Sequence, residues 1–323
     1  KMLQNFLGEN ESVTIGADIQ STFIFERVTI IGIGLIGSSF SRALKSKAGL
    51  VREIIAADSD KNNLAKASDL GIVDTICDDI NEAVSRSDCV ILCTPIGTYE
   101  EIVKQIAPSL PAGCVLSDVG SVKAQPIEKI IPYIPPNVHL VPGHPIAGTE
   151  KSGPEAGFES LFEGRYWLLT PLKNVDRNAV SKMRRLCEGV GAMVEEMDIN
   201  YHDKVLAITS HLPHLIAYTI VGTADDLEDQ TQADVIRFSA SGFRDFTRIA
   251  GSNPVMWRDV FLNNREAVLE MLQRFSEDLS LLQRAIRWGE GDVLEALFTR
   301  TRDIRRGVID ARQDIPPSPN DAK

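Results

Sequence analysis

Two glycine-framed segments of the chain carry the side chains best suited to chemistry. An apolar run from Val28 leads into the turn Gly32–Gly37 (Gly-Ile-Gly-Leu-Ile-Gly), and the later loop Gly143–Glu150 presents His144. A Gly-x-Gly-x-x-Gly turn that follows a strand is typical of dinucleotide binding. A neutral imidazole can accept the proton of an alcohol that is being oxidised. Together the two segments predict a nicotinamide-dependent dehydrogenase.

The glycine turn has the context that a dinucleotide site requires. Gly32 ends the apolar run, Gly34 lets the backbone approach a pyrophosphate, and Gly37 permits close packing of the helix expected at 38–45. Asp58 ends the next strand-like run, where an acid accepts hydrogen bonds from ribose hydroxyls and repels a 2′-phosphate. This pattern favours NAD over NADP as the cofactor. The alternative is a tight glycine turn beside a surface aspartate.

A further strand-like run covers 89–94, and Pro95 follows it. In a doubly wound sheet, Thr94 and Pro95 would line the nicotinamide end of the crevice; the alternative is an ordinary proline turn. The full set of predicted cofactor-binding residues is Gly32, Gly34, Leu35, Ile36, Gly37, Asp58, Thr94 and Pro95.

Polar clusters close two more strand-like runs, at 117–123 and 143–150, and both are expected to face the same crevice. His144 is the candidate general base, and the nearby hydroxyl of Ser121 is a candidate to fix its tautomer. The alternative for His144 is the cap of a local turn.

Two further groups fall in the second half of the chain. His211 and His214 are three residues apart, so they share one helix face, either in the core or lining a pocket. No further Cys or His cluster supports a zinc pair there, so no metal is expected. Arg244 and Arg248 either form a solvated face or hold a carboxylate through bidentate hydrogen bonds.

The elements that position these residues alternate between short apolar runs and helical stretches. Continuous apolar strands separated by helices predict a doubly wound parallel sheet covered on both faces. The strand-like runs are 28–31, 53–57, 89–94, 114–118, 138–142, 166–170 and 192–197.

Helices are expected after residue 198. Residues 201–222 are apolar almost all round, which suggests a helix buried in a core and kinked at Pro213. A long helix is expected from Pro254 to about Trp288, and a last one from a cap at Asp292 to about 312. The domains we predict are an N-terminal arm (1–26), a dinucleotide-binding domain (27–198), a helical substrate and dimerisation domain (199–313) and a polar tail (314–323).

Composition narrows the class of protein. The net charge of −11 argues against a nucleic-acid partner. No stretch approaches the 18 or more consecutive apolar residues of a membrane span, and no signal peptide is visible, so we expect no membrane association. The five cysteines form no C-x-x-C pair and are expected to be buried, reduced thiols in a cytoplasmic protein.

Five segments together resemble the prephenate/arogenate (cyclohexadienyl) dehydrogenases of tyrosine biosynthesis, over roughly residues 27 to 312. They read Gly-Ile-Gly-Leu-Ile-Gly, Asp-Val-Gly-Ser-Val-Lys, Gly-His-Pro-Ile-Ala-Gly-Thr-Glu-Lys-Ser-Gly, Ser-His-Leu-Pro-His and Gly-Phe-Arg-Asp-Phe-Thr-Arg-Ile-Ala. The family implies a Rossmann-like domain with an all-α dimerisation domain, NAD as cofactor, and homodimers whose helical domains interlock.

The resemblance also implies roles for individual residues. His144 matches the histidine that polarises the substrate hydroxyl, Ser121 the serine that orients it, and Arg248 the arginine that holds a carboxylate. Trp257 matches a tryptophan near the dimer-related active site. The implied substrate-binding set is Arg248, His211, His214, Glu150 and Thr149.

Prephenate is the expected substrate, with oxidative decarboxylation to 4-hydroxyphenylpyruvate. Arogenate, or both substrates, is the nearest alternative; no acidic residue is evident beside His211 and His214 to pair with its amine. A β-hydroxyacid dehydrogenase would share the layout, but its G-x-x-x-K-x-x-x-N motif is not found. A non-catalytic NAD sensor would need the segment from Gly32 to Asp58 but not the His144 loop.

Overall fold

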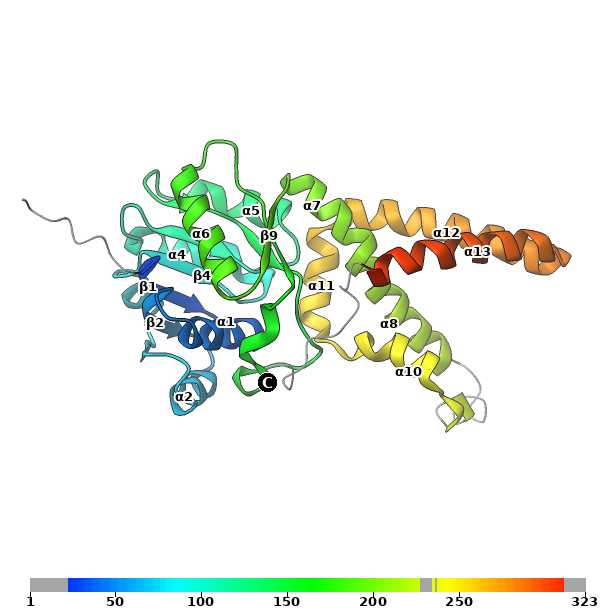
Figure 1. Cartoon of the computed structure of the whole chain (residues 1–323), viewed down its shortest axis with the longest axis horizontal. Helices are drawn as coiled ribbons and strands as arrows, with labels where there is room; N and C mark the ends of the chain where they lie inside the picture. Colours follow the sequence, from blue (N-terminus) through cyan, green and yellow to red (C-terminus); the bar gives the residue numbers. More distant parts are fainter. Residues whose placement is uncertain (1–22, 227–233, 236, 311–323) are drawn as a thin grey trace, which may run out of the picture.

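The computed structural model describes residues 23–226, 234–235 and 237–310. It has two parts, a sheet with helices on both faces and a set of helices that extends away from it (Figure 1). The N-terminal arm expected at 1–26 lies mostly outside the described residues, and the polar tail expected at 314–323 lies wholly outside them.

Six parallel strands form the main sheet in the order β3-β2-β1-β4-β5-β6. This order has its switch point between β1 and β4, so the crevice at the carboxyl ends of these strands is the expected ligand site. The strands are β1 (Phe25–Ile31), β2 (Val51–Ala57), β3 (Thr75–Ile76), β4 (Cys89–Leu92), β5 (Val115–Asp118) and β6 (His139–Leu140).

Both faces of the sheet are buried, which explains why the strands read as continuous apolar runs. One apolar cluster packs α1 (Leu35–Ser46), α2 (Lys61–Asp69) and α6 (Arg177–Gly189) against the sheet. A second packs α3 (Ile80–Val84), α4 (Tyr99–Ile106) and α5 (Ala124–Ile130) on the other face. The predicted doubly wound layout is confirmed.

The last strands do not join this sheet, which corrects the expectation of one continuous parallel sheet. A separate three-stranded sheet contains β7 (Gly143–Pro145), β8 (Tyr166–Leu169) and β9 (Met193–Glu196), and β7 pairs antiparallel with β8. Between β6 and β7 stands Pro142, which has no N–H to continue a ladder. The chain therefore leaves the main sheet there, and His144 lies on a short strand rather than in a loop.

The helical part begins with α7 (Ile199–Leu206), whose cap Asp198 accepts backbone N–H groups of Asn200 and Tyr201. A π-helical turn at Ala207–His211 leads into α8 (Leu212–Asp225), with Pro213 in its first turn. The predicted break at Pro213 thus takes the form of a π-helical turn, which places the proline where a missing N–H is tolerated.

Together these segments, Ile199–Asp225, have the length and mean hydropathy of a membrane span, contrary to the expectation that no stretch would. Length and composition alone are weak evidence, because core helices of soluble proteins pass the same test. Only 28% of the apolar window is buried, so the stretch is not the buried core helix that the sequence predicted. The described residues of a single copy leave most of this apolar surface uncovered.

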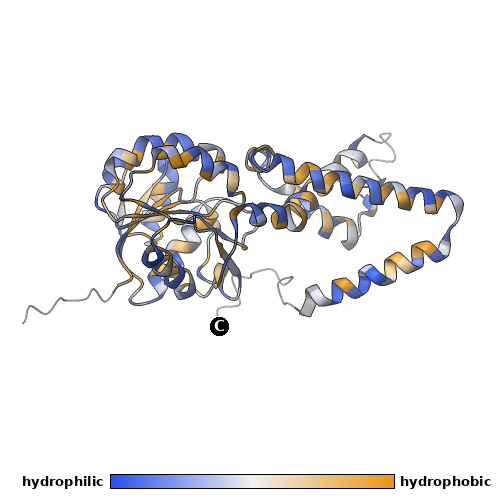
Figure 2. Cartoon of the chain, turned by 90° about the horizontal axis from the view of Figure 1, so that it is seen from above, coloured by the Kyte–Doolittle hydropathy of each residue, from blue (hydrophilic) through white to orange (hydrophobic). Residues whose placement is uncertain are grey.

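Further along the chain lie the helices α10 (Ser241–Thr247), α11 (Pro254–Asn263), α12 (Arg265–Trp288) and α13 (Gly291–Asp310). The long helix predicted from Pro254 to Trp288 is broken at Asn264, and Asp292 lies in the first turn of α13 rather than at its cap. None of the α13 side chains described is buried. Figure 2 shows α12 and α13 diverging from their shared turn, with apolar residues along both.

Candidate active site

The glycine turn has the geometry of a phosphate-binding loop. Gly32 has φ +93°, and a side chain there would collide with the backbone of Cys93. A Cβ at Gly37 would collide with the carbonyl oxygen of Gly32, so the turn and α1 require glycine. At Gly34, by contrast, a Cβ would meet no atom within 4 Å, which leaves room above the N-terminus of α1. A dinucleotide pyrophosphate fits this arrangement.

Asp58 lies directly beside the same turn. Its Oδ2 accepts the backbone N–H of Ile33 at 2.8 Å, and its Oδ1 accepts that of Asp60 at 2.8 Å. The carboxylate is therefore held next to the glycine turn at the carboxyl end of β2, where ribose hydroxyls would lie. Leu35 and Ile36, the first residues of α1, are partly exposed in the same region.

The carboxyl end of β4 contacts the glycine turn. Thr94 is partly buried, and its Oγ1 accepts a hydrogen bond from Thr98 Oγ1 at 2.9 Å, while Pro95 is exposed. If Gly32 carried a Cβ, the methyl group of Thr94 would be among the atoms closest to it. The structure thus brings together all eight predicted cofactor-binding residues.

His144 lies on β7 with an exposed fraction of 8%. Its Nδ1 is 2.9 Å from Nε2 of His202, and none of the described residues hydrogen-bonds its Nε2. Burial, with smaller effects of His202 and Lys123, holds the pKa of His144 well below its ordinary value, so its imidazole is neutral at neutral pH. The sequence suggested that the hydroxyl of Ser121 fixes the tautomer of His144, but the ring that contacts His144 is that of His202. Ser121 lies partly buried in the loop after β5.

A fully buried lysine fixes the strand that carries His144. Lys123 Nζ donates to the carbonyl of Gly143 at 2.7 Å and to Asp118. Asp118 also accepts from the Tyr99 hydroxyl at 3.0 Å and from the backbone N–H of Gly143 at 3.2 Å. Burial lowers the pKa of Lys123, and Asp118 opposes that shift. Through its ion pair with Asp118 and its hydrogen bond to Gly143, the lysine ties β7 to β5.

The two helical histidines lie beside Trp257. The ring of His214 stacks on the indole at 3.6 Å between centroids, and that of His211 meets it edge-on at 6.0 Å. Nδ1 of His211 accepts from Nδ2 of Asn264 at 3.0 Å, so this nitrogen is unprotonated and its Nε2 carries the proton. Burial lowers the pKa of His211 to about 4.

Arg248 lies at the exposed rim of this group. Its Nη1 is 2.8 Å from Oε2 of Glu150, and the two side chains are 53% and 35% exposed. The ion pair joins the helical part to the segment that follows His144. Burial lowers the pKa of His214, and the charge of Arg248 adds a smaller effect in the same direction. Thr149, next to Glu150, accepts the backbone N–H of Lys151 at 3.2 Å.

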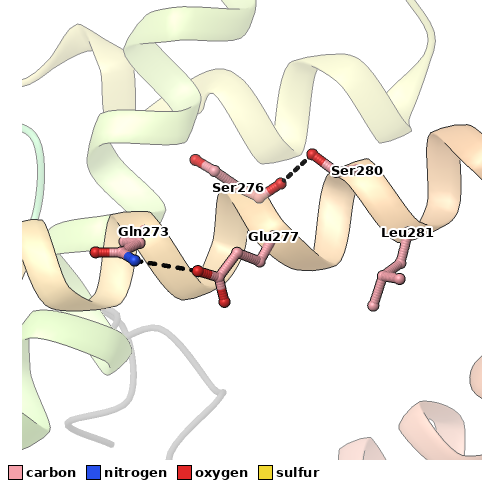
Figure 3. Close-up of a pocket in the computed structure, with 5 residues that line it drawn as sticks. All are labelled: Gln273, Ser276, Glu277, Ser280 and Leu281. Carbon is pink, nitrogen blue, oxygen red and sulfur yellow. Dashed lines mark hydrogen bonds between the residues drawn. The ribbon is translucent and has the colours of Figure 1, made fainter.

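A separate hollow lies on α12, remote from these side chains in the fold (Figure 3). It is lined by Gln273, Ser276, Glu277, Ser280 and Leu281, with a hydrogen bond of 3.1 Å from Gln273 Nε2 to Glu277 Oε1. All its lining residues belong to one helix, and it shares none with the site around His144. It is a feature of the outward helix surface rather than a substrate cavity.

Sequence reasoning missed His202, Asp203 and Asn264, and it gave Lys123 no role. The available signal for the first two was an adjacent His-Asp pair at the start of an otherwise apolar helix. Four of the chain's five histidines, at 144, 202, 211 and 214, lie in this one region. Within the described residues, no group of His, Cys, Asp and Glu has the arrangement of a metal site.

Two family models match the chain. Residues 40–196 match the prephenate dehydrogenase nucleotide-binding domain, and residues 198–300 match the prephenate dehydrogenase dimerization domain.

Named relatives agree with these matches. A cyclohexadienyl dehydrogenase of Zymomonas mobilis is 37% identical over 296 residues, covering 91% of this chain and 99% of the relative. The crystal structure of prephenate dehydrogenase from Aquifex aeolicus with hydroxyphenyl propionate and NAD+ superposes with a TM-score of 0.80 at 35% identity, covering 88% of this chain and 98% of that one. Synechocystis arogenate dehydrogenase has a TM-score of 0.72 at 26% identity, covering 87% and 99%.

Proposed function

Because the chain belongs to the prephenate dehydrogenase family, we propose that this NAD-dependent oxidoreductase converts prephenate to 4-hydroxyphenylpyruvate in tyrosine biosynthesis. The observation that carries the proposal is a buried, neutral His144 whose Nδ1 is occupied and whose Nε2 has no hydrogen-bond partner among the described residues. The family decides against the hydroxyacid dehydrogenase and the non-catalytic sensor as alternatives.

His144 acts in this proposal as the proton acceptor. The hydroxyl O–H bond at C4 of prephenate breaks as a new N–H bond forms at Nε2 of His144. Bound NAD supplies the hydride acceptor. The C4–H bond breaks as the hydride leaves, and the electron pair of the bond between C1 and the carboxylate then moves through the ring toward the C4 oxygen. CO2 is thereby released and the ring becomes aromatic. Aromatisation makes the step effectively irreversible, so the protein's task is orientation and proton transfer.

The neighbours of His144 supply binding groups. Arg248 and Thr149 lie at the rim, and we assign the Arg248 guanidinium to a substrate carboxylate, for which its planar fork is suited. His214, held flat by Trp257, and His211, held as an Nε2 donor by Asn264, line the inner wall. Ser121 lies on the loop between Asp118 and Lys123, and we assign it to the nicotinamide side of the site.

Among the described residues, neither His211 nor His214 has an acidic side chain as a hydrogen-bond or ion-pair partner, because His211 bonds Asn264 and His214 bonds the carbonyl of Ser210. The lack of a carboxylate partner at the two rings supports the side-chain keto group of prephenate over the amino group of arogenate. The test is NADH formation with each substrate at equal concentration. A higher kcat/KM for prephenate supports the proposal, and a higher value for arogenate reassigns the enzyme as an arogenate dehydrogenase.

The helical part is a dimerisation domain by family, and we propose that the enzyme is a homodimer formed through it. Exposed apolar side chains of α12 and α13 support this, among them Leu281, Ile286, Trp288 and Phe298. The outward apolar surface of Ile199–Asp225 is explained in the same way, without a membrane. We further propose a cytoplasmic enzyme, as its free cysteines and small-molecule substrate suggest.

A further inference from the structure

Three buried side chains form a continuous line of hydrogen bonds behind the proposed base. His144 Nδ1 lies 2.9 Å from His202 Nε2, and His202 Nδ1 lies 2.8 Å from Asp203 Oδ1. His202 is fully buried and Asp203 is 5% exposed, so water does not compete for these bonds. Which nitrogen carries each proton therefore depends on the group at the far end.

The far end of the line is an acceptor. Oδ1 of Asp203 accepts the backbone N–H of Lys123 at 2.9 Å, and Oδ2 accepts that of Ala124 at 2.9 Å. A carboxylate surrounded by donors accepts and does not donate. The bond from His202 to Asp203 must therefore use a proton on Nδ1 of His202.

The proton positions then follow along the line. A neutral imidazole has one N–H, so Nε2 of His202 is an acceptor once Nδ1 carries the proton. Nδ1 of His144 must then donate to it, which leaves a lone pair on Nε2 of His144. Burial lowers the pKa of both rings, and the facing charges are Lys123 for both, Asp203 and Asp118 for His202, and His211 for His144.

We propose that Asp203 and His202 are positioning residues that fix the tautomer of His144, so that its Nε2 meets the substrate as a proton acceptor. The inference rests on the proposed role of His144 as the base. The proton taken from the substrate hydroxyl stays on Nε2, and the Nδ1–H bond to His202 persists in the imidazolium. If the line were reversed, Nε2 of His144 would carry a proton beforehand and could accept none.

Asp203→Asn is the variant that reverses the line. The amide can donate to Nδ1 of His202, which drives the proton of His202 to Nε2 and that of His144 to its own Nε2. In Ser-His-Asp enzymes the corresponding change to asparagine lowers kcat about 10⁴-fold through the wrong tautomer. We expect kcat to fall by roughly 10²–10⁴, while the KM values for prephenate and NAD stay within about threefold of wild type. A kcat close to wild type would overturn the proposal.

His202 provides a pair of variants that leave the Asp203 contacts to Lys123 and Ala124 in place. His202→Gln keeps an acceptor near the position of Nε2, and His202→Met, of similar length, has none. Loss of one buried hydrogen bond corresponds to about tenfold, so kcat should be at least about tenfold lower with methionine than with glutamine. Equal kcat in the two variants would contradict the inference. Asp198→Ala, which removes only the cap of the same helix, is the control and should keep wild-type kcat.

Histidine ¹⁵N resonances of the full-length enzyme report the tautomer directly. With the His144 signals assigned by their loss in His144→Asn, wild type should show Nε2 unprotonated and Asp203→Asn should show it protonated. A protonated Nε2 in active wild type would refute the inference. If His144→Asn itself retains turnover, the proposed function fails; if only the Asp203 and His202 variants retain it, the positioning role fails and the proposed function stands.

Discussion

Replacing Arg248 by alanine tests whether this arginine binds the substrate or serves only as a surface partner of Glu150. The two side chains are 53% and 35% exposed, so solvent screens their 2.8 Å ion pair. Exposed pairs contribute about 0–1 kcal/mol to stability. Arg248→Ala should therefore leave the thermal midpoint of unfolding within a few degrees of wild type.

Substrate binding should respond much more strongly. A charge-assisted contact to a carboxylate is worth about 2–4 kcal/mol when it is desolvated. Because Arg248 is half exposed before substrate arrives, the lower end of that range applies, and 2 kcal/mol corresponds to about a 30-fold increase in the KM for prephenate. The KM for NAD should stay nearly unchanged, since Arg248 lies outside the glycine turn. Arg248→Lys should restore binding only in part, because an ammonium lacks the bidentate fork.

The assay is steady-state NADH formation with each substrate varied in turn. Arg177→Ala is the matched control, because Arg177 also forms an exposed ion pair, with Glu196, on the nucleotide-binding part. Glu150→Gln separates the two interpretations further, because it removes the ion-pair partner of Arg248. The KM for prephenate should then either stay the same or decrease. The reasoning is refuted if Arg248→Ala leaves that KM unchanged, or if both variants raise it equally.

The other predictions concern the base, the cofactor, assembly and acid stability. His144→Asn should keep NAD binding and lose about 10²–10⁴ in kcat, and wild-type kcat/KM should rise with pH through a pKa below 6.5; wild-type turnover in the variant would reject the role. Asp58→Ala should narrow the preference for NAD over NADP, and equal kcat/KM for both cofactors in wild type would refute it. Sedimentation should give a homodimer that Phe298→Glu weakens; a stable, active wild-type monomer at micromolar concentration is the contrary result. The pKa of His211 is about 4 in the folded state and 6.5 in the unfolded state. Its contribution of about 3 kcal/mol to the free energy of unfolding is therefore complete above pH 6.5 and is lost as pH falls toward 4. Denaturant titrations of wild type and His211→Asn should differ in how steeply this free energy changes with pH.

The main sheet could be predicted from the sequence because its signals lie in short contiguous segments of the chain. Both faces are buried, so β4 and the carboxyl-terminal halves of β1 and β2 read as largely apolar runs, and the glycine turn marks the switch point. The strand that carries His144 could not be foreseen in the same way. Gly-His-Pro has no strand signature; its partners are β8, more than twenty residues later, and the buried Lys123.

The break at Asn264 has a similar cause. Residues 255–288 contain no glycine or proline, so the sequence alone suggests one helix. Tertiary contacts decide otherwise: Asn264 Nδ2 donates to the carbonyl of Asp203 at 2.9 Å and to His211 at 3.0 Å. His202 could not be predicted for the same reason, because its partner His144 lies 58 positions away in the sequence. The residue types and their spacing in the sequence identify the residues of a site. Tertiary packing decides which ring nitrogen of each histidine forms a hydrogen bond.

One closed ring of contacts joins the base to the junction between the two parts of the molecule. His144 bonds His202, and Asp203 binds the backbone of Lys123. The ammonium of Lys123 then binds Gly143, the neighbour of His144. Every side chain of the ring is buried, so the helical part cannot shift against the sheet at this point without breaking several desolvated hydrogen bonds.

This ring limits where the site can open. The contacts between the two parts at the rim are of another kind, because Arg248 and Glu150 form a half-exposed pair that costs little to break. Substrate entry that exchanges this pair for a carboxylate would leave the orientation of His144 untouched. Because the interior is rigid and the rim is labile, variants at Arg248 should change KM more than kcat. Variants at Asp203 should change kcat more than KM.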